Sequence, residues 1–243
     1  MSKRTLAISD IHGELDLLDR LLKQTGYDPD VDQLVLLGDY IDRGPKSMQT
    51  LERVMELHAA GAIVLKGNHE DLMLRALDGG EDDWKRWIVR NGGYVTLQSY
   101  GFADRQFRIE TGEAFRQPEL DSDTLERHLN FVRSLPAYYE TDDFICVHAG
   151  IPPGKTAAEA DPSDLIWIRE EFHKGYTGVK KVIFGHTPTR SLHGDPDNND
   201  VYYGRNRIIG IDGGAVFEGQ LNALAIESGE TFYVKAIEAI EAT

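Results

Sequence analysis

Six side chains of the kinds that bind metal ions lie just after short apolar runs in this sequence. They are Asp10, His12, Asp39, Asn68, His148 and His186. A mixture of carboxylate, imidazole and amide oxygen suits Mn, Fe or Zn, whereas Ca and Mg prefer oxygen ligands alone. Six ligands exceed what one catalytic metal needs, but a shared carboxylate would let them hold two ions about 3.5–4 Å apart. Such a pair ionises a bridging water near neutral pH and binds both oxygens of an in-line phosphoryl displacement.

The apolar runs themselves predict the strands that position these residues. They cover residues 6–9, 34–37, 63–66, 144–147, 182–184 and 208–211. In open α/β sheets, ligands bind in the crevice beyond the carboxyl ends of the strands. We therefore predict an α/β protein with its site at that edge. The sixth run ends at Asp212, where we expect either a partner for a histidine ligand or a simple turn before Gly213.

Helical patterns separate the first three strands. Leucines between residues 15 and 22 form one stripe that ends at Gly26, and a second helix is expected over 47–60. This alternation predicts parallel strands with right-handed crossovers. Residues 71–135 differ, because helices expected at 71–77, 83–90 and 122–134 follow one another without a strand. We interpret this stretch as a helical insert beside the strand ends.

The C-terminal part is predicted to be a different kind of sheet. Short strands are expected at 207–211, 221–227 and 231–237, antiparallel to one another, with hairpin turns at 218–220 and 228–230. The acidic loop 195–200 spaces its carboxylates like an EF-hand, but it lacks the glycine and the glutamate that an EF-hand needs, so we expect a solvated turn.

Composition places the chain among ordinary soluble proteins and sets limits on its partners. It has 243 residues, and sites spread from Asp10 to Asp212 favour a single domain over residues 1–243. The net charge of −15 opposes binding to polymeric nucleic acid and to anionic membranes. The one cysteine, Cys146, lies in an apolar run and is expected to be a core thiol. A signal peptide and a membrane span are both absent from the pattern, so we expect a cytoplasmic protein. The oligomeric state is left open.

Five motifs together resemble one family. They are Asp10-x-His12, the run from Gly38 to Gly44 (Gly-Asp-x-x-Asp-Arg-Gly), Gly67-Asn68-His69-Glu70, His148-Ala149-Gly150 and Gly185-His186. In this order they resemble the calcineurin-like metallophosphoesterases, and within them the bacterial and phage Ser/Thr phosphatases of the phosphoprotein phosphatase branch. The resemblance implies a β-sandwich of mixed sheets flanked by helices, and two divalent ions, Mn first with Fe or Zn as alternatives.

The resemblance also implies a role for each matching position. Asp10, His12 and Asp39 would hold the first metal, and Asp39 would bridge to a second ion held by Asn68, His148 and His186. Asn68 would also contact the substrate phosphate. His69 would protonate the leaving alkoxide, with Asp42 orienting it and raising its pKa. The remaining histidines, His58, His128, His173 and His193, are interpreted as structural or solvated.

Two arginines are candidates to bind the substrate phosphate. Arg43 follows Asp42 in the second motif, and a guanidinium can contact two phosphate oxygens at once. Arg169 resembles the second phosphate-binding arginine of bacterial members. A surface arginine paired with Glu170 or Glu171 explains that position equally well.

The substrate is predicted from small differences between branches of the family. Symmetrical diadenosine tetraphosphate hydrolases share most motifs but typically lack the counterpart of Asp42 and have Asp where this chain has Glu70. We therefore predict a metal-dependent phosphomonoester hydrolase acting on phosphoserine and phosphothreonine, with dual specificity left open. The alternatives are hydrolysis of diadenosine tetraphosphate or another nucleotide. A catalytically dead scaffold would show eroded ligands, and here all six are present.

The helical insert is a candidate wall of the substrate cleft. Its polar residues Arg86, Arg90, Asn91 and Tyr94 could face the substrate. Its aromatic residues Trp84 and Trp87 are instead expected to pack inside it.

Overall fold

The computed structural model describes residues 3–108 and 115–236, and within these ranges the strands form two five-stranded sheets. The first sheet has the order β10-β9-β1-β2-β3 and the second β4-β5-β6-β8-β7. The strands of the first sheet are β1 (Arg4–Ile8), β2 (Asp32–Leu36), β3 (Ile63–Val64), β9 (Gln220–Ala225) and β10 (Glu230–Lys235). Those of the second are β4 (Tyr138–Glu140), β5 (Phe144–Val147), β6 (Lys181–Phe184), β7 (Tyr202–Tyr203) and β8 (Ile208–Gly210).

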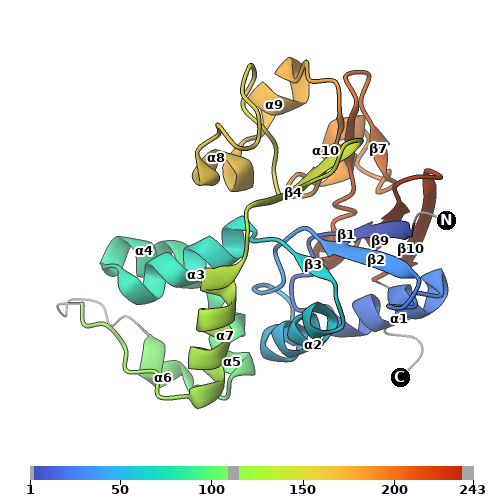
Figure 1. Ribbon diagram of the computed structural model, residues 1–243. Helices are drawn as coiled ribbons and strands as arrows, with labels where there is room; N and C mark the ends of the chain where they lie inside the picture. The colour runs from blue at the N-terminus through green and yellow to red at the C-terminus, as the bar shows by residue number, and fades with distance from the viewer. Residues whose placement is uncertain (1–2, 109–114, 237–243) are drawn as a thin grey trace.

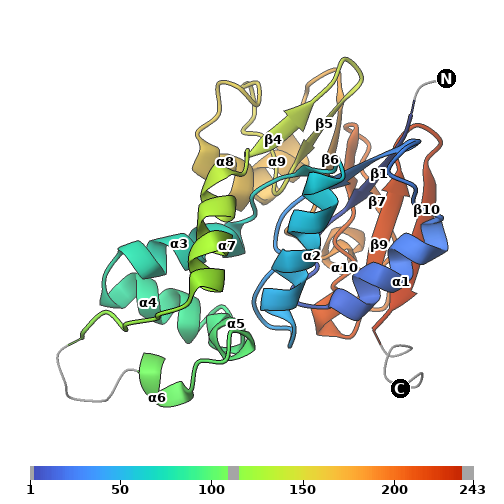
Figure 2. The same cartoon turned by 60° about the horizontal axis from the view of Figure 1, so that its bottom comes forward.

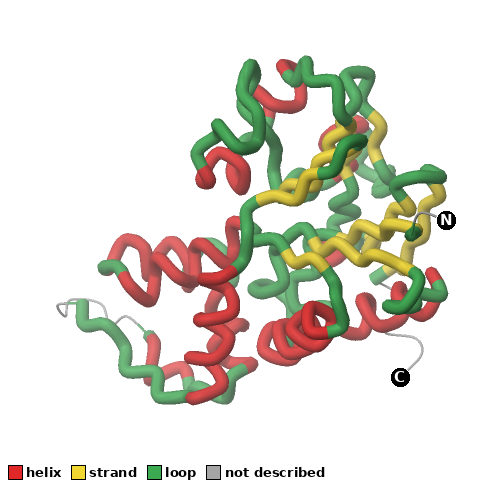
Figure 3. Tube along the Cα trace, in the orientation of Figure 1, coloured by secondary structure: helices red, strands yellow, loops and turns green. Residues whose placement is uncertain are grey.

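Helices flank the two sheets on their outer faces (Figure 1). They are α1 (Leu15–Thr25), α2 (Ser47–Ala59), α3 (Asn68–Asp78), α4 (Glu81–Ile88), α5 (Gly93–Ser99), α6 (Asp104–Phe107), α7 (Asp123–Ser134), α8 (Pro162–Trp167), α9 (Glu170–Gly175) and α10 (Thr189–His193), with a short 3-10 helix η1 (Ala215–Phe217). Helices α1 and α2 cover the first sheet, and α8, α9 and α10 lie against the second (Figures 1 and 2). The tube view shows the strands as two central layers (Figure 3).

The two sheets pack on each other through alternate residues of their strands. Ala7 and Val35 of the first sheet share one buried apolar cluster with Cys146 and Ile183 of the second. The residues between them in the chain, such as Leu6, point to the other face, toward the helices. This alternation is the period of two that a strand imposes. The chain therefore has the predicted α/β architecture of mixed sheets flanked by helices.

The N-terminal half follows the sequence prediction closely. Strands β1, β2 and β3 are parallel neighbours. Helix α1 ends at Gly26, which adopts the left-handed conformation (φ 63°) that lets a helix terminate. Helices α3 to α7 occupy the stretch predicted to be an insert and gather beside the sheets (Figure 1). The indoles of Trp84 and Trp87 are fully buried, as predicted.

Two local predictions are wrong, and helices α5 and α6 of the insert were not predicted. Helix α5 begins at Gly93, directly after Gly92, whose positive φ (86°) turns the chain. Strand β8 is not antiparallel to β9, since it lies in the other sheet and runs parallel to β6. Residues 218–220 therefore connect the two sheets and form no hairpin. The hairpin at 228–230 does join β9 to β10, and the predicted strand end at residue 237 lies outside the described residues.

Cys146 is a core thiol, as predicted. Its side chain is completely buried, and burial raises the pKa of the thiol. Among the described residues, the structure has no helix with the length and apolar character to span a bilayer.

Candidate metal centre and active site

The polar residues that follow the strands are held by unusual backbone conformations. Among the described residues, eight that are not glycine have a positive φ, a conformation that L-residues rarely adopt. Six of the eight lie at this site: Asp10, His12, Asp39, Asp42, Arg43 and His186. Such backbone strain clusters where a fold must aim side chains at one point. The strand ends therefore turn sharply, and they do so where the chemistry was predicted.

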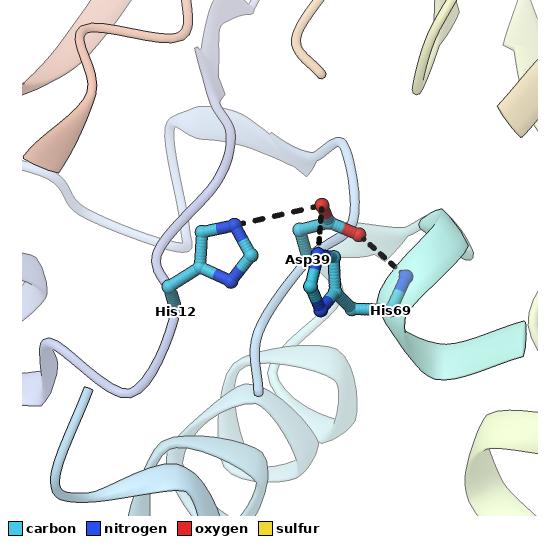
Figure 4. Close-up of side chains that lie close together, drawn as sticks. All are labelled: His12, Asp39 and His69. Carbon is cyan, nitrogen blue, oxygen red and sulfur yellow. Dashed lines mark hydrogen bonds and ion pairs between the residues drawn. The ribbon is translucent and has the colours of Figure 1, made fainter. Parts of the chain in front are cut away.

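Asp39, just beyond β2, lies at the centre of these residues. Its side chain is almost completely buried. Its Oδ2 lies 3.6 Å from Nε2 of His12 and 3.9 Å from Nε2 of His69, and its Oδ1 lies 3.4 Å from Nε2 of His148. Figure 4 shows the carboxylate between the rings of His12 and His69, with Oδ1 accepting a hydrogen bond from the backbone N–H of His69 (2.9 Å).

Two groups of side chains around Asp39 converge closely enough to hold an ion. Within the described residues, they are His12, Asp39 and His69, and Asp39, His148 and His186, all buried, with ligand atoms within 4.8 Å of one another. Asp39 belongs to both groups. This is the geometry that a carboxylate shared by two metal ions requires.

Hydrogen bonds to Nδ1 orient two of the histidine rings for metal binding. Nδ1 of His12 lies 2.8 Å from the carbonyl oxygen of Ile41, and Nδ1 of His148 lies 2.8 Å from that of Leu37. A carbonyl oxygen only accepts, so each Nδ1 must carry the proton. Hydrogen bonds of this kind fix the tautomer and direct Nε2 toward a metal.

The surroundings of His186 also indicate that the site fits a metal ion. Its Nε2 is buried and has no hydrogen-bond partner, which is costly unless a ligand satisfies it. Burial lowers the pKa of His186, and likewise that of His12, well below the ordinary value, so both rings are neutral as metal ligands must be. Burial also opposes protonation of His148, but the Asp39 carboxylate outweighs it and raises that pKa to about 9 in the metal-free protein. The donor set fits divalent ions.

Asp10 and Asn68 line the same cavity, whose volume is about 270 Å³. Oδ2 of Asp10 accepts from the hydroxyl of Ser9 (2.5 Å) and from the backbone N–H of His186 (3.0 Å). Oδ1 of Asn68 lies 2.9 Å from Nε2 of His148. The structure thus brings all six predicted ligands to one place, although the convergent groups include His69 and not Asp10.

His69 and Asp42 form a buried pair beside this cluster. Nδ1 of His69 lies 2.6 Å from Oδ2 of Asp42, and neither side chain is more than 1% exposed. Burial alone would lower the pKa of His69, but the carboxylates of Asp39 and Asp42 raise it above its ordinary value. The ring can therefore carry a proton at neutral pH, with its second nitrogen at the cavity.

Both predicted arginines line the cavity. Nη1 of Arg43 lies 2.6 Å from Nε2 of His12. Nη1 of Arg169 donates to the hydroxyl of Thr187 (2.9 Å), next to His186, while Glu170 pairs with Lys174. The placement of Arg169 favours the phosphate-binding interpretation over a surface ion pair.

Of the other residues that the sequence suggested, some line the cavity and some make contacts elsewhere. Asn91 lines the cavity, but the hydroxyl of Tyr94 donates to Asp104. Asp212 also lines it, and its Oδ1 accepts from the backbone N–H of Gly214 (2.8 Å), as in the turn interpretation. Burial raises the pKa of Asp212 well above the ordinary value.

Sequence reasoning missed two aromatic residues of the cavity. Trp167 ends α8 and Phe217 ends η1, and both rings line the cavity. The guanidinium of Arg86 lies over the Trp167 ring (4.8 Å), and that of Arg43 lies over the Phe217 ring (5.0 Å). Neither position carries a local signal, because each lies at the end of a short helix whose place beside the cavity depends on distant parts of the chain.

The other four histidines make local contacts. His128 is buried between Tyr100 and Glu52, at 2.6 and 2.7 Å. His58 and His193 each bond a backbone carbonyl, and His173 stacks near Phe184. These contacts agree with the interpretation of all four as structural.

Comparison with known proteins agrees with this geometry. The family model described as calcineurin-like phosphoesterase matches residues 3–213. Serine/threonine-protein phosphatase 1 of Salmonella typhimurium is 29% identical over 225 residues, covering 90% of each chain. The asymmetrical bis(5'-nucleosyl)-tetraphosphatase PrpE of Bacillus thuringiensis is 27% identical over 259 residues, covering 93% of this chain and 92% of that one. Among solved structures, a provisionally assigned diadenosine tetraphosphatase superposes with a TM-score of 0.68 over 97% of this chain and 94% of its own, at 18% identity, which shows the fold.

The chain belongs to the calcineurin-like metallophosphoesterases. It is a metal-dependent hydrolase of phosphoesters with a buried cluster of histidine and aspartate side chains that fits a dinuclear metal site. The relatives divide between protein phosphatases and dinucleotide hydrolases, so the substrate within this family is the remaining question.

Proposed function

We propose that this protein is a phosphomonoester hydrolase whose substrates are phosphoserine and phosphothreonine in proteins. The observation that carries the proposal is the 2.6 Å contact between His69 Nδ1 and Asp42 Oδ2 beside the metal cluster. An alkoxide leaves poorly unless an acid protonates it, and an imidazolium held by a carboxylate is such an acid. The leaving group from a dinucleoside polyphosphate is itself a phosphate and needs little protonation. A buried acid is therefore most useful for an alkyl monoester.

We assign the metal ligands as the family resemblance implies. Asp10, His12 and Asp39 would hold one ion, and Asp39 with Asn68, His148 and His186 the other. Manganese is the first choice, and iron or zinc would suit the same donors. When bound, the two ions supply an ionised water and neutralise charge on the phosphate.

The remaining steps belong to the chain itself. Arg43 and Arg169 bind oxygens of the substrate phosphate from two sides of the cavity, and the amide of Asn68 contacts it too. This fixes the phosphorus in line between the attacking water and the leaving oxygen. As the P–O bond to the alcohol breaks, the proton on His69 Nε2 passes to the leaving oxygen. Asp42 keeps the other ring nitrogen protonated and in place.

A second candidate function has a specific observation in its favour. The rings of Trp167 and Phe217 line the cavity, and aromatic rings of this kind stack on nucleobases. Relatives named as nucleosyl-tetraphosphatases match most of the chain. Hydrolysis of a dinucleoside tetraphosphate is therefore the alternative.

The proposal is tested by comparing substrates on the manganese-loaded enzyme. We expect kcat/KM for a phosphoserine peptide to equal or exceed that for diadenosine tetraphosphate, and an aryl phosphodiester to be hydrolysed more slowly than the corresponding monoester. The Asp39→Asn variant, purified in parallel, measures background from contaminating phosphatases. A kcat/KM on the dinucleotide a hundredfold above that on the peptide would rule out the protein-phosphatase proposal.

A further inference from the structure

We propose that the helical insert positions the acid pair of the active site, with Trp87 and Thr96 acting as positioning residues that hold Asp42 against His69. The inference rests on the proposed role of His69 as the acid. Trp87 belongs to α4 and Thr96 to α5, about 45 to 55 positions along the chain from Asp42. The insert would thus do more than form a wall of the substrate cleft.

The oxygens of Asp42 are surrounded by donors from the insert. Oδ1 accepts from the hydroxyl of Thr96 (2.6 Å) and from the indole N–H of Trp87 (3.0 Å). Oδ2 accepts from the same indole N–H (3.1 Å) and from Nδ1 of His69 (2.6 Å). Asp42 has no exposed surface. These bonds therefore fix the plane of the carboxylate and direct Oδ2 at the histidine.

Thr96 holds the backbone of the same residue. Its Oγ1 accepts from the backbone N–H of Asp42 (2.9 Å), which also lies 3.0 Å from Oγ of Ser47, while its hydroxyl proton goes to the Asp42 side chain. The backbone of Asp42 has a positive φ of 71°, a conformation that residues other than glycine adopt uncommonly. The hydroxyl of Thr96 thus contacts both the main chain and the side chain of the residue that orients the acid.

The position of the Trp87 indole is itself fixed by the insert. The ring is completely buried and packs edge-on against Trp84, with centroids 5.9 Å apart. It also lies against Gly93, where a Cβ atom would come within 2.4 Å of the ring. Gly93 therefore leaves the space in which the indole N–H can reach Asp42. An indole nitrogen only donates, so this contact cannot exchange its proton with the acid pair.

Loss of these donors should slow the hydrolysis of substrates with poor leaving groups in particular. A freed Asp42 carboxylate would rotate, and His69 would lose the orientation that aims Nε2 at the leaving oxygen. The loss should matter for a poor leaving group and little for a good one, because only the former needs protonation. A purely structural role would instead reduce all activities together.

The test uses Trp87→Phe, which keeps an aromatic ring but lacks the N–H, and Thr96→Val, which lacks the hydroxyl. We expect kcat on a phosphoserine peptide to fall about 10–100-fold in each. We expect kcat on 4-nitrophenyl phosphate, whose phenolate leaves readily, to change less than about threefold. Thr96→Ser, which restores the hydroxyl, should recover most of the loss. Bound manganese, measured in each variant, should stay near the wild-type value, and Tm should fall by only several degrees, so that each variant is folded at the assay temperature.

Trp84→Phe is the matched control, because phenylalanine keeps an aromatic ring against Trp87 and removes the N–H of Trp84. Trp84 is equally buried, but its indole N–H donates to the carbonyl oxygen of Phe107 (3.2 Å), away from Asp42. Loss of this N–H should change kcat on the peptide and kcat on 4-nitrophenyl phosphate by the same factor. A selective loss in Trp87→Phe but not in Trp84→Phe would support the proposal.

A double-mutant cycle with His69→Asn separates this inference from the proposed function. If Asp42 acts through His69, Trp87→Phe should have almost no further effect on the peptide once His69 is removed. Suppose that His69→Asn lowers kcat on the peptide selectively, whereas Trp87→Phe and Thr96→Val lower kcat equally on both substrates. That result would overturn this inference but not the acid role of His69. An equal loss on both substrates in His69→Asn would overturn the acid role and this inference with it.

Discussion

At the scale of single residues, Asp39 combines nearly complete burial with a negative charge. Burial alone would raise its pKa, but the neighbouring imidazoles, His148 first and then His69, hold the pKa of the carboxyl well below the ordinary value. The residue therefore stays ionised where two cations can share it. Burial lowers the pKa of His12 and of His186, whereas for His69 the carboxylates of Asp39 and Asp42 outweigh burial and raise the pKa. The pKa values of these histidines are therefore shifted in opposite directions, as the proposed division into metal ligands and an acid requires.

Arg43 gives the sharpest prediction at this scale. Its guanidinium lies between His12 and the Phe217 ring at the cavity, where it can contact two oxygens of a phosphate. We expect Arg43→Ala to lower kcat/KM for a phosphopeptide about 10–100-fold, the effect of losing a charge-assisted hydrogen bond. Arg43→Lys should be intermediate, because an ammonium keeps the charge but lacks the planar fork.

The control for Arg43 is Arg53→Ala. Arg53 pairs with Asp19 and Glu56 at the surface, away from the cavity. Its kinetics should match those of the wild type. Unchanged kcat/KM in Arg43→Ala would remove Arg43 from the phosphate site.

At the scale of elements, the sequence predicts what depends on neighbouring residues and misses what depends on distant ones. The buried strands were predictable because each is a continuous apolar run closed by glycine and polar residues. The placement of β8 was not, because its parallel pairing with β6 is decided by a chain segment more than twenty residues away. Helix α5 was not predicted, because it is short and begins at Gly93 directly after Gly92, and glycine is unfavourable inside a helix.

The residues of the site also differ in how well they could be predicted from the sequence. The motif residues could be predicted, since each follows a strand that ends at the same edge. Trp167 and Phe217 could not, because they end short helices, α8 and η1, whose place beside the cavity depends on distant parts of the chain. The bonds of Trp87 to Asp42 were equally hidden, since a buried tryptophan on a helix is most simply read as core.

The start of β2 provides a prediction about pH. Asp32 accepts from Nε and Nη2 of Arg4 on β1 (2.9 and 2.6 Å), and this pairing lowers the pKa of its carboxyl. A carboxyl with a lowered folded-state pKa stabilises the fold above its unfolded pKa of about 3.9, and the stabilisation is lost as the pH falls through the folded-state value. Arg4 is one-third exposed, so the solvent weakens the pair.

We therefore expect Asp32→Asn to lower the free energy of unfolding by about 1–2 kcal/mol at pH 7. The difference from the wild type should narrow as the pH falls from 6 to 3. Urea unfolding in the presence of a chelator measures both without a contribution from metal loss. Asp30→Asn, at an exposed position in the same turn, is the control. A difference that stays constant over this range would contradict the assigned pairing.

At the scale of the whole molecule, the candidate metal ligands come from both sheets. Asp10 and Asp39 follow β1 and β2 of the first sheet, whereas His148 and His186 follow β5 and β6 of the second. Bound ions would therefore tie the two layers together at the edge where the strands end. With a net charge of −15, the protein repels an anionic substrate at long range, so the ions and the cavity arginines must supply the attraction locally.

The measurement that tests the central claim most directly is the number of manganese ions bound per chain, followed by calorimetric titration together with activity and Tm. We predict two ions per chain, phosphomonoesterase activity that requires the second, and stabilisation of about 2.7 kcal/mol at a hundredfold excess over Kd. Asp39→Asn should bind at most one ion and lose at least about a hundredfold in kcat. Asp197→Asn, in the acidic loop, should behave as the wild type. An Asp39→Asn variant that still binds two ions and keeps its activity would contradict the shared carboxylate and the account built on it.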